Sequence, residues 1–172
     1  MTFSEMNRPD LDTLKHIPKI AVTVLLDNVR SLMNVGSVFR TCDGFLIEKI
    51  ILCGITGIPP HREIQKTALG ATETVSWTHE RDILSALSKL KNDGHICIGV
   101  EQTIPSVSLI DMLPEKGKKY AVIFGSEVDG ISNEVLYLLD FCIEIPQGGM
   151  KHSLNVSVAA GIVLHHFYEA LK

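Results

Sequence analysis

Residues 120–132 have the sequence YAVIFGSEVDGIS, in which an apolar run leads directly into a glycine-containing loop. The run YAVIF lacks the alternation of apolar and polar residues that a half-exposed strand shows, so it predicts a strand buried on both faces. The residues after the loop, 132–139, predict a helix. A buried strand, a loop and a helix in succession are the unit from which parallel α/β sheets are built.

Further buried strands and helices alternate on both sides of this unit. The predicted strands are residues 20–26, 49–53, 74–77, 95–100 and 141–145, and the predicted helices are residues 34–44, 61–69, 81–90 and 153–170. The alternation predicts an α/β fold with a mostly parallel sheet and helices on both faces. We expect residues 19–172 to form one domain and residues 1–18 to form a loose N-terminal arm.

The composition is that of an ordinary globular protein. Of the 172 residues, 45% are hydrophobic and 21% are charged. The longest apolar run, residues 156–164, is too short to span a bilayer, and the acidic N-terminus does not resemble a secretory signal. We therefore expect a cytoplasmic protein without a membrane segment. Widely spaced cysteines predict buried, structural thiols and no metal site; they are Cys42, Cys53, Cys97 and Cys142.

The net charge of −4 argues mildly against a nucleic-acid-binding protein, because such proteins typically carry a basic surface. A local basic patch can nevertheless bind phosphates on an acidic protein. The candidate patches are Lys15 with Lys19, Arg30 with Arg40, His61 with Arg62 and Lys66, Lys116 to Lys119, and Lys151 with His152.

Several familiar phosphate and catalytic motifs are missing from the sequence. The loop GSEVDGIS has the glycine spacing of a P-loop, but Ile131 stands where a P-loop has its lysine. No strand is followed by G-x-G-x-x-G, and neither H-E-x-x-H nor G-x-S-x-G occurs. These absences disfavour an NAD-binding or phosphate-binding α/β protein.

Three polar segments instead follow buried strands or lie close after them. They are residues 28–41 (NVRSLMNVGSVFRT), residues 124–130 (FGSEVDG) and residues 145–157 (IPQGGMKHSLNVS). In a parallel sheet, the loops after the strands gather at the carboxyl edge, where ligands bind. We therefore expect these three segments to meet in one site.

The three segments resemble the motifs of the SpoU (TrmH-like) family of SPOUT methyltransferases. The spacings agree: Asn34 lies six residues before Arg40, and Glu127 lies 26 residues before Ser153. The string SLNVSVAA, residues 153–160, is the most specific part of the resemblance. Residue 147 departs from the family pattern near the expected cofactor loop, since it is Gln where many relatives have Met.

The resemblance implies a fold and a cofactor. In this family the C-terminal segment passes through a loop and forms a deep trefoil knot, an exception to the general absence of knots. The knot holds S-adenosylmethionine in a bent form, largely through backbone groups. Carried over by position, the cofactor contacts fall on Gly125, Ile145 and Leu154, with Val100, Glu101 and Met150 beside them.

The resemblance also implies the reaction, a methyl transfer from S-adenosylmethionine to a ribose 2′-hydroxyl of RNA. Family precedent gives Arg40 the role of activating the nucleophile. Because a guanidinium is effectively never deprotonated, we expect Arg40 to hold the neighbouring phosphate while a phosphate oxygen takes the proton. Asn34 would support Arg40 or the RNA backbone, and Glu127 would orient a loop or an arginine of a partner subunit. Ser153 and Asn155 would cap the last helix and aim the ribose.

Assembly and substrate follow from the same resemblance. Residues 154–164 are almost all apolar or small, so the final helix needs a cover on every side, and the family forms dimers through such helices. We therefore expect a homodimer. The absence of an added N-terminal RNA-binding domain favours tRNA over rRNA. The alternatives are an rRNA 2′-O-methyltransferase and a non-catalytic RNA-binding module of the same fold.

Overall fold

The computed structural model describes residues 17–150 and 153–172, which form a single seven-stranded sheet with its covering helices. The strand order is β3-β2-β1-β6-β4-β7-β5, and every neighbouring pair is parallel. The strands are β1 (Ile20–Asp27), β2 (Ile47–Cys53), β3 (Ser76–Glu80), β4 (His95–Val100), β5 (Val107–Ser108), β6 (Lys119–Phe124) and β7 (Phe141–Glu144). The predicted α/β fold with a parallel sheet is confirmed.

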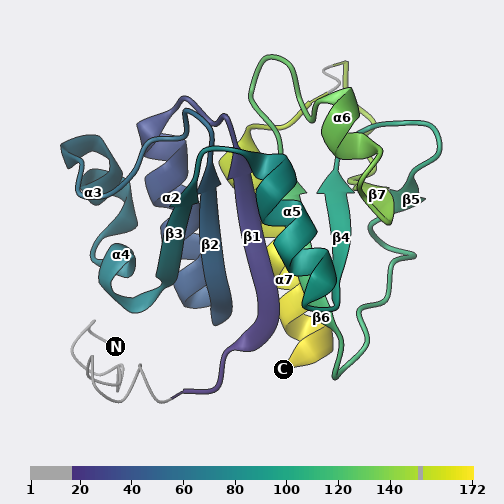
Figure 1. Ribbon diagram of the computed structural model, residues 1–172, viewed down its shortest axis with the longest axis horizontal. Coiled ribbons are helices and arrows are strands. Elements are labelled where there is room, and N and C mark those ends of the chain that lie inside the picture. The colour runs from purple at the N-terminus through teal and green to yellow at the C-terminus, as the bar shows by residue number, and fades with distance from the viewer. Residues whose placement is uncertain (1–16, 151–152) are drawn as a thin grey trace.

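Helices cover both faces of the sheet, as Figure 1 shows with α5 in front and α2 and α7 behind. The helices are α2 (Leu32–Gly44), α3 (Arg62–Ala68), α4 (Ala71–Thr74), α5 (Ile83–Asn92), α6 (Asn133–Leu136) and α7 (Val156–Leu171). Adjacent residues of a strand point to opposite faces. Val24 therefore packs with Phe39 of α2 and Phe167 of α7, while Leu25 packs with Leu87 of α5.

Some element boundaries differ from the sequence prediction. Strand β3 spans Ser76–Glu80 instead of 74–77, because three of its five residues are exposed at the sheet edge and the strand has no apolar run. The predicted helix 132–139 is only the single turn α6, and the short elements α4 and β5 were not predicted. The final helix begins at Val156 rather than at residue 153.

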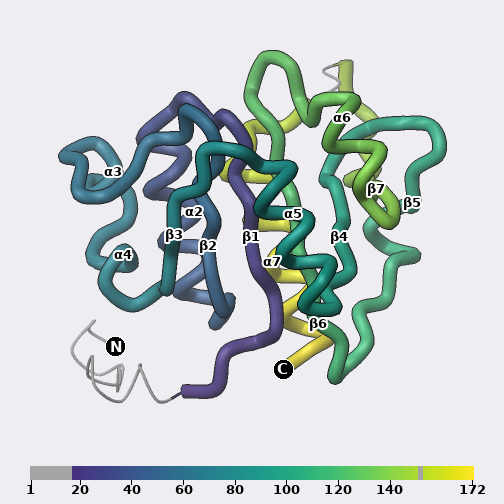
Figure 2. The backbone as a smooth tube through the Cα atoms, viewed as in Figure 1, coloured from purple at the N-terminus to yellow at the C-terminus, as the bar shows by residue number. Residues whose placement is uncertain are grey.

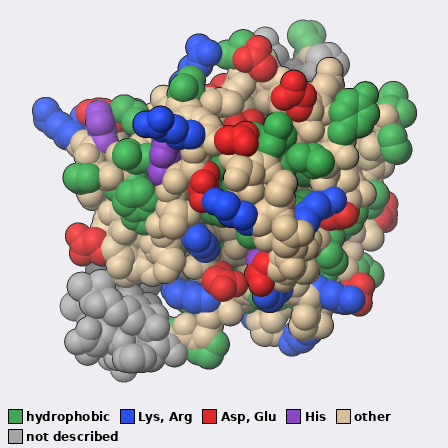
Figure 3. All heavy atoms as spheres, viewed as in Figure 1, with side chains coloured by type: hydrophobic (Ala, Val, Ile, Leu, Met, Phe, Trp, Pro, Cys, Tyr) green, Lys and Arg blue, Asp and Glu red, His purple; other side chains and the backbone are tan. Residues whose placement is uncertain are grey.

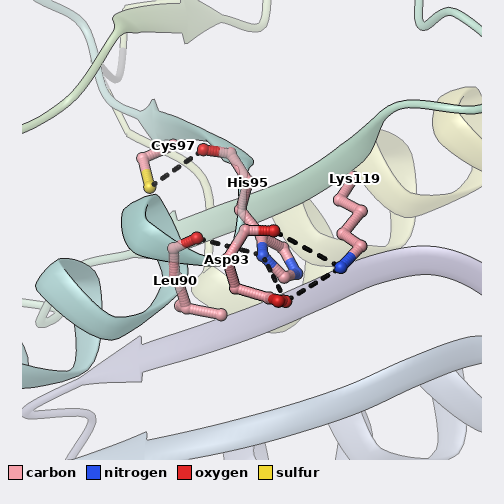
Figure 4. Close-up of polar contacts among 5 residues, drawn as sticks. All are labelled: Leu90, Asp93, His95, Cys97 and Lys119. Atoms are coloured by element: carbon pink, nitrogen blue, oxygen red, sulfur yellow. Dashed lines mark hydrogen bonds and ion pairs between the residues drawn. The ribbon is translucent and has the colours of Figure 1, made fainter.

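A polar cluster lies at the end of the sheet where β4 and β6 begin (Figure 4). The Nζ atom of Lys119 lies 3.0 Å from the Asp93 carboxylate and donates to the Asp93 carbonyl at 3.3 Å. The hydrogen bond from Lys119 to the carboxylate lowers the pKa of Asp93. Beside it, Nδ1 of His95 donates to the Leu90 carbonyl at 3.2 Å. These contacts join the end of α5 to the starts of two neighbouring strands.

The opposite edge carries the loops that follow the strands. Figure 2 shows the chain after β1, the chain after β6 and the chain before α7 coming together there. The strand order does not test the trefoil knot, which stays a prediction. The basic patch at Lys151 and His152 and the first sixteen residues of the predicted arm lie outside the described residues.

Candidate active site

The carboxylate of Glu127, in the loop after β6, joins two of the three predicted segments. It accepts hydrogen bonds from the backbone N–H groups of Arg30 at 3.2 Å and Ser31 at 3.4 Å, and from Nδ2 of Asn34 at 3.0 Å. Burial raises the pKa of Glu127, but these hydrogen bonds outweigh it, so the pKa lies below its ordinary value of 4.5. Glu127 is therefore held as a carboxylate by the start of α2.

The third segment joins through Asn155, whose Nδ2 donates to Oδ1 of Asn34 at 3.2 Å. Asn155 is also the N-cap of α7, since its Oδ1 accepts from the backbone N–H of Ser157 at 2.9 Å and from the Ser157 hydroxyl at 2.6 Å. Ser31 caps α2 in the same way, accepting from the Asn34 N–H at 3.3 Å. One chain of hydrogen bonds, Glu127–Asn34–Asn155, thus connects the three segments and the starts of two helices. We call these three residues the motif bridge.

A cavity of about 540 Å³ lies against the motif bridge. Five of the six predicted cofactor positions line it, and so do three of the five predicted catalytic residues: Val100, Glu101, Gly125, Ile145, Leu154, Glu127, Ser153 and Asn155. Met150 does not line the cavity and is 92% exposed. Gln147, the departure from the family pattern, does line it. The cavity size is within the usual range for small-molecule sites.

The wall of the cavity formed by the loop after β6 depends on two glycines. A Cβ atom on Gly125 would lie 2.2 Å from the backbone carbon of Gly130, because the loop closes on itself through paired hydrogen bonds between Ser126 and Gly130. Gly130 has a φ of 66°, which favours glycine. The sequence predicted that Gly125 lies against the cofactor. The structure gives a second reason for glycine at this position, because the loop after β6 fills the space that a side chain would need.

Glu101, which was predicted as a cofactor contact and lines the cavity, binds the end of this loop. Its Oε2 accepts from the backbone N–H of Ile131 at 3.1 Å, and its Oε1 accepts from the N–H of Gln102 at 3.1 Å. Both carboxylate oxygens are therefore engaged by backbone.

Arg40 lies apart from the cavity. It is exposed on α2 and lines a separate depression with Ser37, Lys66 and Gly161. A helix advances about 9 Å over the six residues from Asn34 to Arg40 and turns to another face. Within one chain, the structure therefore brings four predicted catalytic residues together at or beside the cavity and leaves Arg40 outside.

The residues that support the first segment were not predicted from the sequence. Thr56, in the loop after β2, accepts from the N–H of Val29 at 3.0 Å and donates to the Leu26 carbonyl at 2.9 Å. Asn28, with a φ of 55°, accepts from the N–H of Ile55 at 3.1 Å. An Asn directly after a buried strand could have indicated such a turn, but nothing in the sequence marks Thr56 as its partner.

Neither a metal cluster nor a membrane-spanning helix occurs in the described part of the chain. No group of three or more His, Cys, Asp or Glu side chains in residues 17–150 and 153–172 is placed to hold a metal ion. No helix within the same ranges is both long and apolar enough to cross a membrane.

Comparison with known proteins gives the family. The model of the SpoU rRNA Methylase family matches residues 21–165. The chain belongs to this family. A tRNA (guanosine(18)-2'-O)-methyltransferase from Thermus thermophilus is 34% identical over 144 residues, which are 83% of this chain and 72% of that protein. A 23S rRNA (guanosine-2'-O-)-methyltransferase from Neisseria meningitidis is 29% identical over 153 residues, 89% of this chain and 60% of that protein.

The same fold occurs in solved structures of the SpoU family. The AdoMet-bound rRNA methyltransferase from Sinorhizobium meliloti superposes with a TM-score of 0.83 at 26% identity, covering 92% of this chain and 60% of that one. The chain also spans only 59% of the length of its TrmH-family relatives from Staphylococcus. The family resemblance predicted from the three motifs is confirmed.

Proposed function

We propose that this SpoU-family chain transfers a methyl group from S-adenosylmethionine to a ribose 2′-hydroxyl of RNA. The observation that carries the proposal is the motif bridge at the rim of the cavity. It joins Asn34, Glu127 and Asn155 from three distant segments, and those segments are the ones that resemble the motifs of the family.

The residues of the cavity fit S-adenosylmethionine. Apolar side chains suited to the faces of an adenine line it, among them Val100, Ile145 and Leu154. Carboxylates at Glu127 and Asp129 also line it and favour a ligand that carries a positive sulfur. When bound, the cofactor supplies an electrophilic methyl group. A relative of the same fold is described as AdoMet-bound.

The part of the protein is to hold the ribose so that its 2′-oxygen lies in line with the methyl carbon. The oxygen–carbon bond forms as the carbon–sulfur bond breaks, the sulfur keeps the electron pair, and the 2′-proton leaves to an acceptor. Asn155 and Ser153, at the mouth of the cavity, would hold the ribose, with Asn34 and Glu127 fixing Asn155. Arg40 would bind the adjacent phosphate, whose oxygen takes the proton.

Within one chain Arg40 lies outside the cavity, which supports a role for Arg40 at the cavity of a second copy of the chain. An apolar stripe suited to such a contact runs along α7, where Val158 and Ile162 are 50% and 40% exposed. The opposite side of α7 is buried in the core. We therefore propose a homodimer that packs α7 and the exposed side of α2 against a partner and brings Arg40 to the partner's cavity.

The proposed RNA is tRNA, acted on in the cytoplasm. The support is the relative with the highest identity among those described above, a tRNA methyltransferase. The second candidate substrate is rRNA, because the relative from Neisseria meningitidis is a 23S rRNA methyltransferase.

The test has two stages. Calorimetry should detect binding of S-adenosylmethionine, and incubation with the labelled cofactor should then transfer label into bulk tRNA, with hydrolysis products carrying it as 2′-O-methylnucleosides. Arg40→Ala should abolish the transfer while leaving cofactor affinity unchanged. Cofactor binding with no transfer into either tRNA or rRNA would instead indicate a non-catalytic RNA-binding module.

A further inference from the structure

A row of loops extends the carboxyl edge of the sheet beyond the candidate site. The last residues of three neighbouring strands are paired in register, Asp27 with Cys53 and Cys53 with Glu80. Because neighbouring strands lie about 4.8 Å apart, the loop after β3 begins roughly 10 Å from the loop after β1 and roughly 15 Å from the loop after β6. This row is therefore continuous with the site along one edge.

Cationic and histidine side chains gather on this row. Figure 3 shows Lys, Arg and His side chains over α3 and the upper ends of β2 and β3. The exposed members are Arg30, His61, Arg62, His79 and Arg81. We call these five residues the edge strip.

The carboxylates near the edge strip are already engaged. Glu63 pairs with Lys66 at 2.7 Å, and Glu80 pairs with Lys89 at 2.9 Å. The carboxylate of Asp82 caps α5, accepting from two backbone N–H groups. The structure shows no ion pair between a described residue and Arg30, Arg62 or Arg81. The guanidinium groups are therefore placed to bind an external anion.

The shape and the neighbours of the edge strip favour RNA as that anion. The edge strip runs from the loop after β1 to the loop after β3, and this span of roughly 10 Å matches about three nucleotides at about 3.4 Å each. Ile55 and Ile58 are 63% and 45% exposed beside the cations. Histidine rings, guanidinium planes and exposed apolar side chains can stack against the unpaired bases of an RNA loop.

The edge strip is also physically connected to the candidate site. His79 donates from Nε2 to the Gly54 carbonyl at 3.0 Å, which ties β3 to the loop after β2. That loop holds the loop after β1 through Thr56 and Asn28. The loop after β1 donates in turn to Glu127. An RNA bound along the edge strip would therefore rest on the same loops that position the motif bridge.

We propose that the edge strip is the docking surface for the RNA strand flanking the methylated nucleotide, bound through its phosphates. This inference rests on the proposed function. It assigns substrate binding to Arg62 and Arg81, which lie outside the three family motifs.

The test is RNA affinity as a function of salt. Binding of unfractionated tRNA and of rRNA is measured for the wild type and for Arg62→Ala/Arg81→Ala at several KCl concentrations. Loss of two phosphate contacts should weaken binding about tenfold at low salt and lower the slope of log K against log salt by about 1.4 for a single strand. In methyl transfer, the KM for RNA should rise while kcat and cofactor affinity stay unchanged.

Two controls separate a docking surface from a general charge effect. Lys116→Ala/Lys118→Ala removes the same charge from exposed residues at the opposite edge of the sheet and should keep the wild-type slope. Arg62→Lys/Arg81→Lys keeps the charges and should restore most of the slope.

A slope for Arg62→Ala/Arg81→Ala equal to that of the lysine control would overturn the proposal, as would a wild type that binds neither RNA. Binding that depends on the edge strip without methyl transfer by the wild type would refute the proposed function alone, because salt dependence is measured without turnover.

Discussion

Glu127 and Asn155 carry the connection between the three segments, and each does so with more than one polar atom. The two oxygens of Glu127 accept from three donors at the start of α2. Asn155 uses its oxygen to cap α7 and its nitrogen to reach Asn34. Isosteric substitutions can therefore remove one contact at a time.

Glu127→Gln should reduce methyl transfer by about ten- to a hundredfold with little change in melting temperature. The amide –NH2 replaces either the oxygen that accepts from Arg30 or the oxygen that accepts from Ser31 and Asn34, so at least one donor loses its acceptor. Because the pKa of Glu127 is lowered in the folded protein, the contribution of its carboxylate is present above pH 4.5 and is lost as the pH falls through the folded-state value. NMR checks this contact through the chemical shift of the Arg30 amide. In the wild type the shift should titrate below pH 4.5, and in Glu127→Gln this titration should be absent.

Asn155→Asp and Asn155→Ala should separate capping from the motif bridge. Asp keeps the oxygen that caps α7 and loses the donor to Asn34, so transfer should fall while unfolding free energy changes little. Ala loses both, and should also destabilise the protein by about 1 kcal/mol. Denaturant unfolding measures the stability of both variants, and initial rates measure their methyl transfer. Equal rates for Asn155→Asp and the wild type would show that the hydrogen bond to Asn34 has no part in turnover.

At the level of elements, the loop after β6 is a self-packed turn whose shape forms the cavity wall. Gly125→Ala should abolish measurable cofactor binding and cost about 1–3 kcal/mol of stability, since the new Cβ overlaps the backbone of Gly130. Gly148→Ala is the matched control, because nothing lies within 4 Å of its added Cβ. Calorimetric titration of the two variants with S-adenosylmethionine gives the comparison, and similar affinities would contradict the assigned shape.

The sequence predicted those elements whose burial leaves a clear pattern. The runs in β1, β4 and β6 are apolar because helices cover both faces, and a continuous apolar run of this length is typical of such a strand. Strand β5 has only two residues, Val107 and Ser108, so no period can appear. Capping depends on the local turn, and for this reason Asn155 rather than Ser153 proved to be the N-cap of α7.

At the scale of the whole molecule, sequence spacing predicted which segments meet but not how. Parallel strands place their following loops at one edge, so the proximity of Asn34, Glu127 and Asn155 followed from topology. The contacts among them depend on side-chain rotamers and on loop closure, which spacing does not encode. For Arg40, the sequence predicted that the residue lies on a helix, because helical spacing is a local pattern. Its distance from the cavity could not be predicted, because that distance depends on the path of α2 in the folded chain.

The placement of Arg40 leads to a test on mixed dimers. Arg40→Ala subunits keep the cavity, and Gly125→Ala subunits keep the arginine, so each homodimer should be inactive. If Arg40 serves the cavity of the partner, a dimer of one subunit of each kind has one complete site. Random exchange of equal amounts should then restore about a quarter of wild-type activity.

The same experiment requires that the subunits associate through α7. Val158→Asp places a charge on the exposed apolar stripe and should shift sedimentation at micromolar concentration from dimer to monomer, whereas Ile110→Asp, at another exposed apolar residue, should not. The Val158→Asp monomer should bind cofactor and transfer no methyl groups, because its cavity lacks the partner's arginine. Activity in that monomer, or no restoration in the mixture, would show that Arg40 reaches the cavity of its own chain through a rearrangement of α2.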